Sequence, residues 1–106
     1  MKKLIALALT TLMLTSLLSG CGSSDGKAKT VTSGKLTVAT SPDFAPMEFV
    51  DPSKEGQDMY VGFDLTLAHH IADSMGLELV VMPMSFDACQ TAVYAGTVDM
   101  AISGFS

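Results

Sequence analysis

The chain has 106 residues, of which 48% are hydrophobic, and its 11 acidic residues outnumber its 6 basic ones to give a formal net charge of −5. This balance excludes the broad basic surface that neutralises the phosphates of a nucleic acid. It also argues against electrostatic attachment to anionic lipid. Residues 35–106, the part whose composition suits folding, are a marginal length for one hydrophobic core.

The first 20 residues have the features of a secretory signal peptide. Lys2 and Lys3 give a basic start, Leu4–Leu14 is a mostly apolar stretch, and small residues precede Cys21. The apolar stretch is too short to span a membrane. The alternative is a buried core helix, which seldom begins at residue 4 and ends in Ser-Gly-Cys-Gly-Ser-Ser. We therefore expect residues 1–20 to direct export.

Leu18-Ser19-Gly20-Cys21 resembles the lipobox of bacterial lipoproteins. The resemblance implies that the Cys21 thiol receives a diacylglyceryl group and that the peptide is cut just before it. Two acyl chains anchor a protein stably, whereas one binds only marginally. An ordinary signal peptide with a chance cysteine is the alternative. We expect an extracytoplasmic protein anchored by lipid to the outer face of the cell membrane, or a periplasmic one.

Residues 21–34 are expected to form a flexible tether between this anchor and the folded part. The stretch is dominated by glycine, serine, threonine and lysine, and Val31 is its single bulky apolar residue. Such a sequence buries too little surface to offset the entropy of ordering it.

The folded part, residues 35–106, begins with a β-prone stretch, Leu36–Thr40, that stops at Ser41-Pro42. We predict a loop over Asp43–Pro46, an extended segment over Met47–Val50 and a turn over Asp51–Asp58. A helix then follows. Its N-cap is predicted at Asp64, its apolar face holds Leu65, Ala68, Ile71 or Ala72, and Met75, and Gly76 stops it.

Two further strands and a second helix complete the pattern. Leu77–Met82 is apolar enough to be buried on both faces of a parallel sheet. The second helix is predicted over Phe86–Ala95, with Cys89, Ala92 and Val93 facing inward and Gly96 after its end. Cys89 lies among Ala88, Ala92 and Val93 in a helical pattern, so it fits a small buried hydrophobe. Once Cys21 is acylated, no second cysteine would be left to form an intrachain disulfide with it. Val98–Ser103 is the third strand.

The predicted order β-α-β-α-β implies right-handed crossovers and a three-stranded parallel sheet, an α/β fold. Ligands of such sheets bind beyond the carboxyl ends of the strands. Those ends are Ser41–Phe44, Met84–Phe86 and Ser103–Ser106.

Three segments carry a family resemblance. They are Leu36–Phe49 (LTVATSPDFAPMEF), Val61–Leu65 (VGFDL) and Val98–Gly104 (VDMAISG). Their order and spacing resemble the start of the extracytoplasmic solute-binding proteins of polar amino acid ABC transporters, solute-binding family 3. The resemblance implies the first part of one lobe of a type II periplasmic-binding-protein fold, in which two lobes close on an amino acid and deliver it to a membrane permease.

The resemblance also implies roles for individual residues. Phe44 would stack on the ligand, and Phe86 would be its counterpart on the opposite side. Ser103, Gly104 and Ser106 would line the α-carboxylate, Ser106 through its hydroxyl. Ser41 stands where many relatives carry an acid that reads a basic or amide side chain. The serine leaves a preference for a basic ligand open, and Asp43, two residues on, could substitute for the acid.

Several other residues are assigned to structure rather than to ligand binding. Phe49 and Phe63 are expected in the core, and Glu48 and Asp64 are expected to be turn and cap residues. His69 and His70 are adjacent on a helix and lack the i, i+4 spacing of a metal pair. We therefore expect no metal site and no cofactor.

Two other classes of function stay open. Some relatives of this fold are dehydratase-like enzymes, and others are sensory domains of receptors. Catalysis needs a positioned acid or base, and only Asp43 and Asp87 lie near the strand ends. We expect no enzymatic activity. The chain stops at a strand end, before the arginine and second lobe that the resemblance implies, so we expect it to be the N-terminal part of a longer protein.

Overall fold

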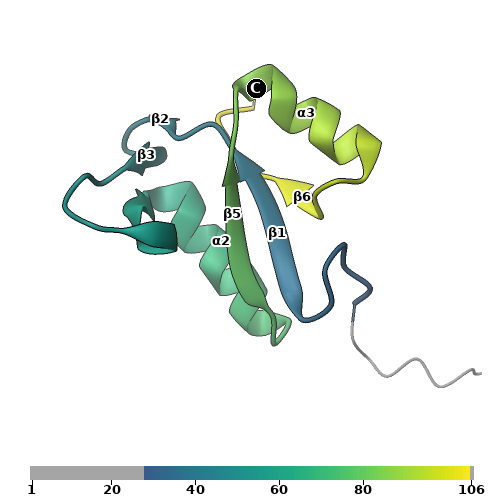
Figure 1. Cartoon of the computed structure of the whole chain (residues 1–106). Helices are drawn as coiled ribbons and strands as arrows, with labels where there is room; N and C mark the ends of the chain where they lie inside the picture. Colours follow the sequence, from purple (N-terminus) through teal and green to yellow (C-terminus); the bar gives the residue numbers. More distant parts are fainter. Residues whose placement is uncertain (1–27, 106) are drawn as a thin grey trace, which may run out of the picture.

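A computed structural model describes residues 28–105 (Figure 1). The proposed signal peptide, Cys21 and Ser106 lie outside the described residues. Within them, no helix is both long and apolar enough to cross a membrane.

The centre of the fold is a parallel sheet of three strands in the order β5-β1-β6. β1 (Lys35–Thr40) pairs along its length with β5 (Glu78–Pro83), and its Val38 and Ala39 pair with β6 (Met100–Ala101). Both pairings are parallel, so the predicted β-α-β-α-β order is confirmed. The third strand is shorter than the predicted Val98–Ser103.

β1, and not β5, is the strand buried on both faces. Every residue of β1 after Lys35 is buried, whereas β5 lies at the edge and is partly exposed along most of its length. The prediction that Leu77–Met82 is buried on both faces was therefore wrong. On the outer edge of β5, the Gln57 side chain accepts from Val81 N (2.6 Å) and donates to Val81 O (3.2 Å).

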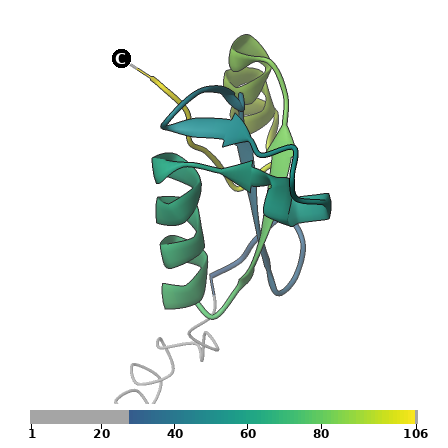
Figure 2. The same cartoon turned by 90° about the vertical axis from the view of Figure 1, so that its left-hand side faces the viewer.

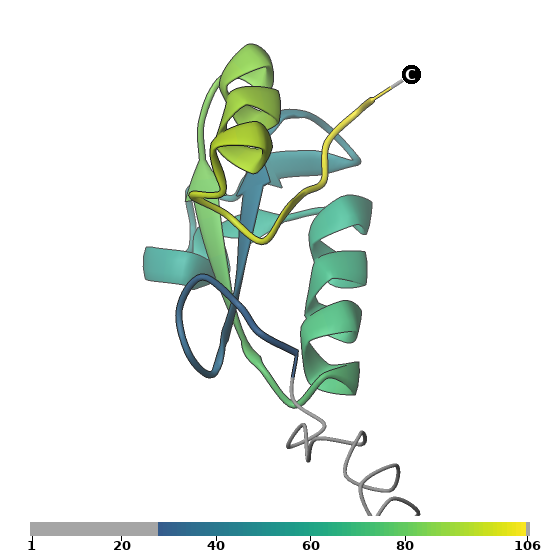
Figure 3. The ribbon, with the colours of Figure 1, turned by 90° about the vertical axis from the view of Figure 1, so that its right-hand side faces the viewer.

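Two helices cover opposite faces of the sheet (Figure 3). Side chains alternate along a strand, so Val38 packs with α2 (Phe63–Ser74) while its neighbour Ala39 packs with α3 (Phe86–Ala95). The α2 face buries Ala68 and Ala72. The α3 face buries Cys89 and Ala92, which confirms Cys89 as a buried apolar residue with a free thiol.

The helix boundaries are close to those expected, with corrections. The Ser85 hydroxyl caps α3 by accepting from Ala88 N, and Gly96 follows its end as predicted. Val93 is exposed rather than inward-facing. Gly62, not Asp64, is the N-cap of α2, and Asp64 lies buried in the first turn. Phe63 is 65% exposed, so its assignment to the core was also wrong.

A second, antiparallel sheet was not predicted. It consists of β2 (Asp43–Phe44), β3 (Glu48–Val50) and β4 (Tyr60–Val61), in that order, and a 3-10 helix over Gly56–Met59 precedes β4. Figure 2 shows these strands lying over the N-terminal end of α2. The helix holds them there, because Phe63 N donates to Pro46 O (3.1 Å) and Asp64 N donates to Met47 O (2.8 Å). These are helix-terminal N–H groups that have no partner inside the helix.

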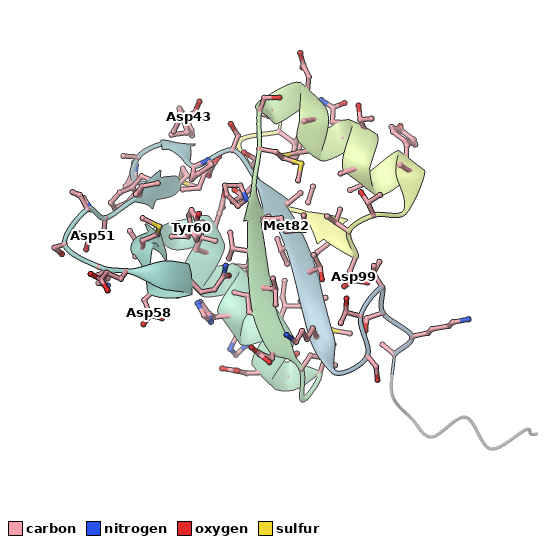
Figure 4. All side chains as sticks on the ribbon, in the orientation of Figure 1. Asp43, Asp51, Asp58, Tyr60, Met82 and Asp99 are labelled. Atoms are coloured by element: carbon pink, nitrogen blue, oxygen red, sulfur yellow. The ribbon has the colours of Figure 1, made fainter. Side chains whose placement is uncertain are left out.

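Asp99 joins the start of β1 to the approach to β6. Its two carboxylate oxygens accept from Val31 N (2.8 Å) and Thr37 N (2.7 Å), and its own N–H donates to Thr37 O (2.9 Å). In Figure 4 Asp99 lies beside the loop that leads into β1, whereas Asp43 lies at the other end of that strand. Asp43 and Asp99 therefore lie at opposite ends of the parallel sheet.

Candidate functional site

A hollow of about 260 Å³ lies beyond the carboxyl ends of β1 and β6, where ligands of parallel sheets bind. It brings together six residues from separate parts of the chain: Asp43, Phe44, Glu48, Phe86, Ser103 and Gly104. Five of these are residues singled out from the sequence, and Glu48 is the addition. We call this hollow the cleft.

Two aromatic rings form the apolar walls of the cleft. Phe44, on β2, is 56% exposed, and Phe86 is the first residue of α3. The Phe44 ring lies against the Gly104 backbone, since a Cβ placed on Gly104 would come within 3.3 Å of Phe44 Cδ1. Phe86 contacts Phe105, with ring centroids 4.8 Å apart. A large apolar side chain left this exposed beside a hollow is available for a ligand.

Asp43 and Ser41 are joined but have different positions. Asp43 is exposed and lines the cleft, whereas Ser41 is buried and does not. The Ser41 hydroxyl donates to Asp43 Oδ1 (3.1 Å), and Asp43 N donates to Ser41 O (2.9 Å). Ser41 therefore orients the Asp43 carboxylate.

Glu48 is the residue that sequence reasoning missed. Its side chain is 1% exposed, and its Oε1 accepts from Ser103 Oγ (2.6 Å) and from Gly104 N (3.0 Å). Its assignment as a turn residue was wrong, because it belongs to β3 and binds the segment after β6. An acid between Met47 and Phe49 in an extended segment was the available signal, but its partners are 55 and 56 positions away.

Asp64 is a buried acid next to Glu48, and its pKa is raised. Burial, followed by the hydrogen bond and the negative charge of Glu48, raises the pKa of Asp64 from 3.8 to about 6. Burial also raises the pKa of the Cys89 thiol, with a smaller contribution from the charge of Glu48. A thiol of this kind is a poor nucleophile.

The charge of the cleft is acidic. Among residues 28–105, no lysine, arginine or histidine lines it, whereas Asp43 and Glu48 do. His69 and His70 are both exposed on α2. The described residues also contain no group of three or more histidine, cysteine or acidic side chains placed to hold a metal ion. The arrangement suits an organic cation held between aromatic faces and a carboxylate.

Two other hollows in residues 28–105 are larger than the cleft. One, of about 550 Å³, lies beside β4 and α2 and includes Tyr60 and His69, and the other, of about 460 Å³, lies where the chain enters β1. Neither lies at the carboxyl ends of the parallel strands. The cleft is the hollow that combines this position with convergent aromatic and polar groups.

Comparison with protein families gives a match over residues 36–106 to the family described as bacterial extracellular solute-binding proteins, family 3. The arginine-binding extracellular protein ArtP of Bacillus subtilis (strain 168) is 38% identical over 106 residues, which are 100% of this chain and 39% of ArtP. The cyclohexadienyl dehydratase of Pseudomonas aeruginosa is 38% identical over 74 residues, which are 70% of this chain and 26% of that enzyme.

Solved structures show the same fold. The arginine-bound form of domain 1 from TmArgBP superposes with a TM-score of 0.63 at 40% identity, over 69% of this chain and 55% of that one. The present chain therefore spans less than two thirds of the relatives it matches. Its α/β architecture is that of the first domain of an amino-acid-binding protein.

Proposed function

The chain belongs to family 3 of the bacterial extracellular solute-binding proteins, and we propose that it contributes one wall of a binding site for a cationic amino acid, with arginine as the first candidate. The observation that carries this proposal is the cleft itself, in which two phenylalanine rings and two carboxylates converge without a described basic residue. The names of ArtP and of domain 1 from TmArgBP, both of which refer to arginine, support the same ligand.

The residues that the family resemblance singled out have proposed roles in ligand binding. Phe44 and Phe86 stack on the two faces of the ligand side chain, where a guanidinium gains from the aromatic quadrupoles. Asp43 pairs with the guanidinium and takes the place of the acid that many relatives carry at the position of Ser41. Ser103 and Gly104 line the ligand backbone, and the Ser106 hydroxyl and an arginine beyond it hold the α-carboxylate.

We further propose that the protein acts outside the cell and hands its ligand to the permease of an ABC transporter. Residues 1–20 direct export, Cys21 carries the lipid anchor, and the stretch up to residue 34 spaces the binding domain from the membrane. Labelling of cells with a fatty acid analogue should mark the wild type and not the Cys21→Ala variant. Cys89→Ala, which removes the chain's other cysteine, should label like the wild type, and equal labelling of Cys21→Ala would contradict the anchor.

Binding is favoured over catalysis by the state of the acids in the cleft. A general acid or base has to reach the proton that it transfers. Glu48 is buried and its Oε1 is already bonded to Ser103 and Gly104, while Asp64 does not line the cleft. Asp43 alone is exposed there, and the exposed aromatic walls suit a ligand that is held rather than converted.

The charge preference can be measured by titration calorimetry on the full-length protein. Citrulline has the shape of arginine without its charge, so we expect it to bind at least about ten-fold more weakly, since a charged hydrogen bond contributes about 1.5–3 kcal/mol. Asp43→Asn should weaken arginine binding and reduce the difference in affinity between arginine and citrulline. Equal affinities of the wild type for arginine and citrulline would contradict the proposed ligand class.

A further inference from the structure

Glu48 connects the two sides of the cleft. It lies on β3, on the same small sheet as Phe44, and its Oε1 accepts hydrogen bonds from Ser103 Oγ (2.6 Å) and Gly104 N (3.0 Å). The Phe44 ring lies against Gly104 in turn. A single buried carboxylate oxygen thus fixes the distance between the aromatic wall and the segment that follows β6.

The second carboxylate oxygen of Glu48, Oε2, has no hydrogen-bond donor among the described residues. Oε2 is fully buried, yet no N–H or hydroxyl of the described residues bonds to it. Leaving a buried carboxylate oxygen without a donor is costly. Burial, and then the neighbouring Glu48 carboxylate, favour the protonated form of the Asp64 carboxyl, and a protonated Asp64 would be the donor that Oε2 lacks. The bond from Asp64 N to Met47 O (2.8 Å) holds the two residues together.

We propose that Glu48 is a positioning residue for ligand binding, which holds Ser103 and Gly104 in place for the ligand while Asp64 donates a hydrogen bond to its other oxygen. The proposal rests on the proposed function, since it assigns the cleft to ligand binding. It gives a reason for a buried carboxylate at the edge of the cleft.

The surroundings of the pair make it sensitive to pH. The titratable groups near it are Asp43 on β2 and the Cys89 thiol on α3. Neither ion pair among the described residues, Lys35–Glu78 or Lys54–Asp51, includes Glu48 or Asp64. A proton on Asp64 would therefore be what removes the repulsion between the two buried acids.

The direction in which pH changes stability follows from the pKa of Asp64 in the folded and unfolded states. The pKa of Asp64 is about 6 in the folded protein and 3.8 as its ordinary value, so the folded state holds the proton more tightly. Its stabilising contribution is complete below pH 3.8 and is lost as the pH rises through about 6. The Gly104 amide, which donates to Glu48, should report the same titration.

Three variants of the full-length protein test the proposal, with arginine affinity measured well below the melting temperature. Glu48→Ala removes the acceptor of two hydrogen bonds and should weaken binding about ten-fold or more. Glu48→Gln keeps an oxygen for Ser103 and Gly104 and gains an N–H for Asp64, so it should restore most of that loss. Glu55→Ala, an exposed acid outside the cleft, is the matched control and should change nothing.

A second readout does not need the ligand. The Gly104 amide resonance should shift with an apparent midpoint near pH 6 in the wild type and should be flat over that range in Asp64→Asn. Unchanged arginine affinity of folded Glu48→Ala would make Glu48 a structural residue only and would overturn the proposal, as would a Gly104 resonance that ignores pH. If the wild type binds no arginine, the proposed function fails, and the Gly104 titration still decides whether the contact exists.

Discussion

The two sheets of this molecule are held together by different forces. The parallel sheet β5-β1-β6 is buried between α2 and α3 through apolar side chains such as Leu36 and Val38. The antiparallel sheet β2-β3-β4 has few buried apolar residues. It is attached by hydrogen bonds that N–H groups at the N-terminus of α2 donate to the segment between β2 and β3, and by those that Glu48 on β3 accepts from Ser103 and Gly104. The first sheet provides stability, while the second carries Asp43 and Phe44 into the cleft.

This difference predicts which residues can be substituted without destabilising the fold. The cleft residues other than Glu48 are exposed or partly exposed, so substituting them removes little buried apolar surface. Residues that join the two sheets cannot be substituted without loss of stability, because they contribute to the stability of both. Variants at the joint, in the core and in the cleft should therefore have effects of decreasing size on the stability of the unliganded protein.

The largest effect is expected at the joint, from Gly62→Ala. Gly62 has a φ of 122°, and a Cβ there would lie 2.3 Å from Met47 O, a backbone atom that cannot easily move. Backbone strain and overpacking each cost about 1–3 kcal/mol, so we expect a loss of about 2–6 kcal/mol in the free energy of unfolding. Chemical denaturation measures this loss.

Gly96→Ala is the matched control for Gly62→Ala. Gly96 also has a positive φ, of 70°, but nothing lies within 4 Å of its added Cβ. Its cost should be limited to conformational strain. If both variants lose the same stability, the close approach of Gly62 to Met47 does not hold the small sheet to α2.

A smaller effect is expected in the core, from Leu36→Ala. Leu36 is buried in the cluster between β1 and α2, at the end of β1 away from the cleft. The lost burial and the resulting cavity should cost about 2–5 kcal/mol of stability, whereas the arginine affinity of the folded protein should not change. Leu67→Ala on the exposed side of α2 is the control. A large change in affinity for Leu36→Ala would show that core and cleft are not separable.

The same division explains what the sequence could predict. The alternation of apolar strands and helices, with Gly76 and Gly96 after the helices, was sufficient to predict the parallel sheet and both helices, because burial of apolar residues produces a local periodicity. The small sheet was missed because its strands have only two or three residues and are fixed by long-range polar contacts. Asp64 was taken for a cap, since its partner Glu48 is 16 positions earlier in the chain and no local pattern relates them.

Most of the site residues predicted from the family resemblance lie together in the cleft. Glu48, which is bonded to two of them, was missed. Asp43, Phe44, Phe86, Ser103 and Gly104 line one cleft together with Glu48, whereas Ser41 is bonded to Asp43 and does not line it. The resemblance named positions most of which line the cleft. The hydrogen bonds that support those positions depend on three-dimensional placement.

The smallest effect on stability, and the most direct test of the cleft as the ligand site, is Phe44→Ala in the full-length protein. Because the ring is 56% exposed, its removal should cost less than about 1 kcal/mol of unliganded stability. The loss of one aromatic contact with the ligand, worth about 1–3 kcal/mol, should weaken arginine binding about ten- to a hundred-fold. Phe63→Ala removes a similarly exposed ring outside the cleft and should leave affinity unchanged.

The measurement is the melting curve without ligand and the arginine dissociation constant on the same Phe44→Ala sample. A nearly unchanged melting temperature with weakened binding is the predicted result, whereas a large drop in melting temperature with unchanged affinity would contradict it.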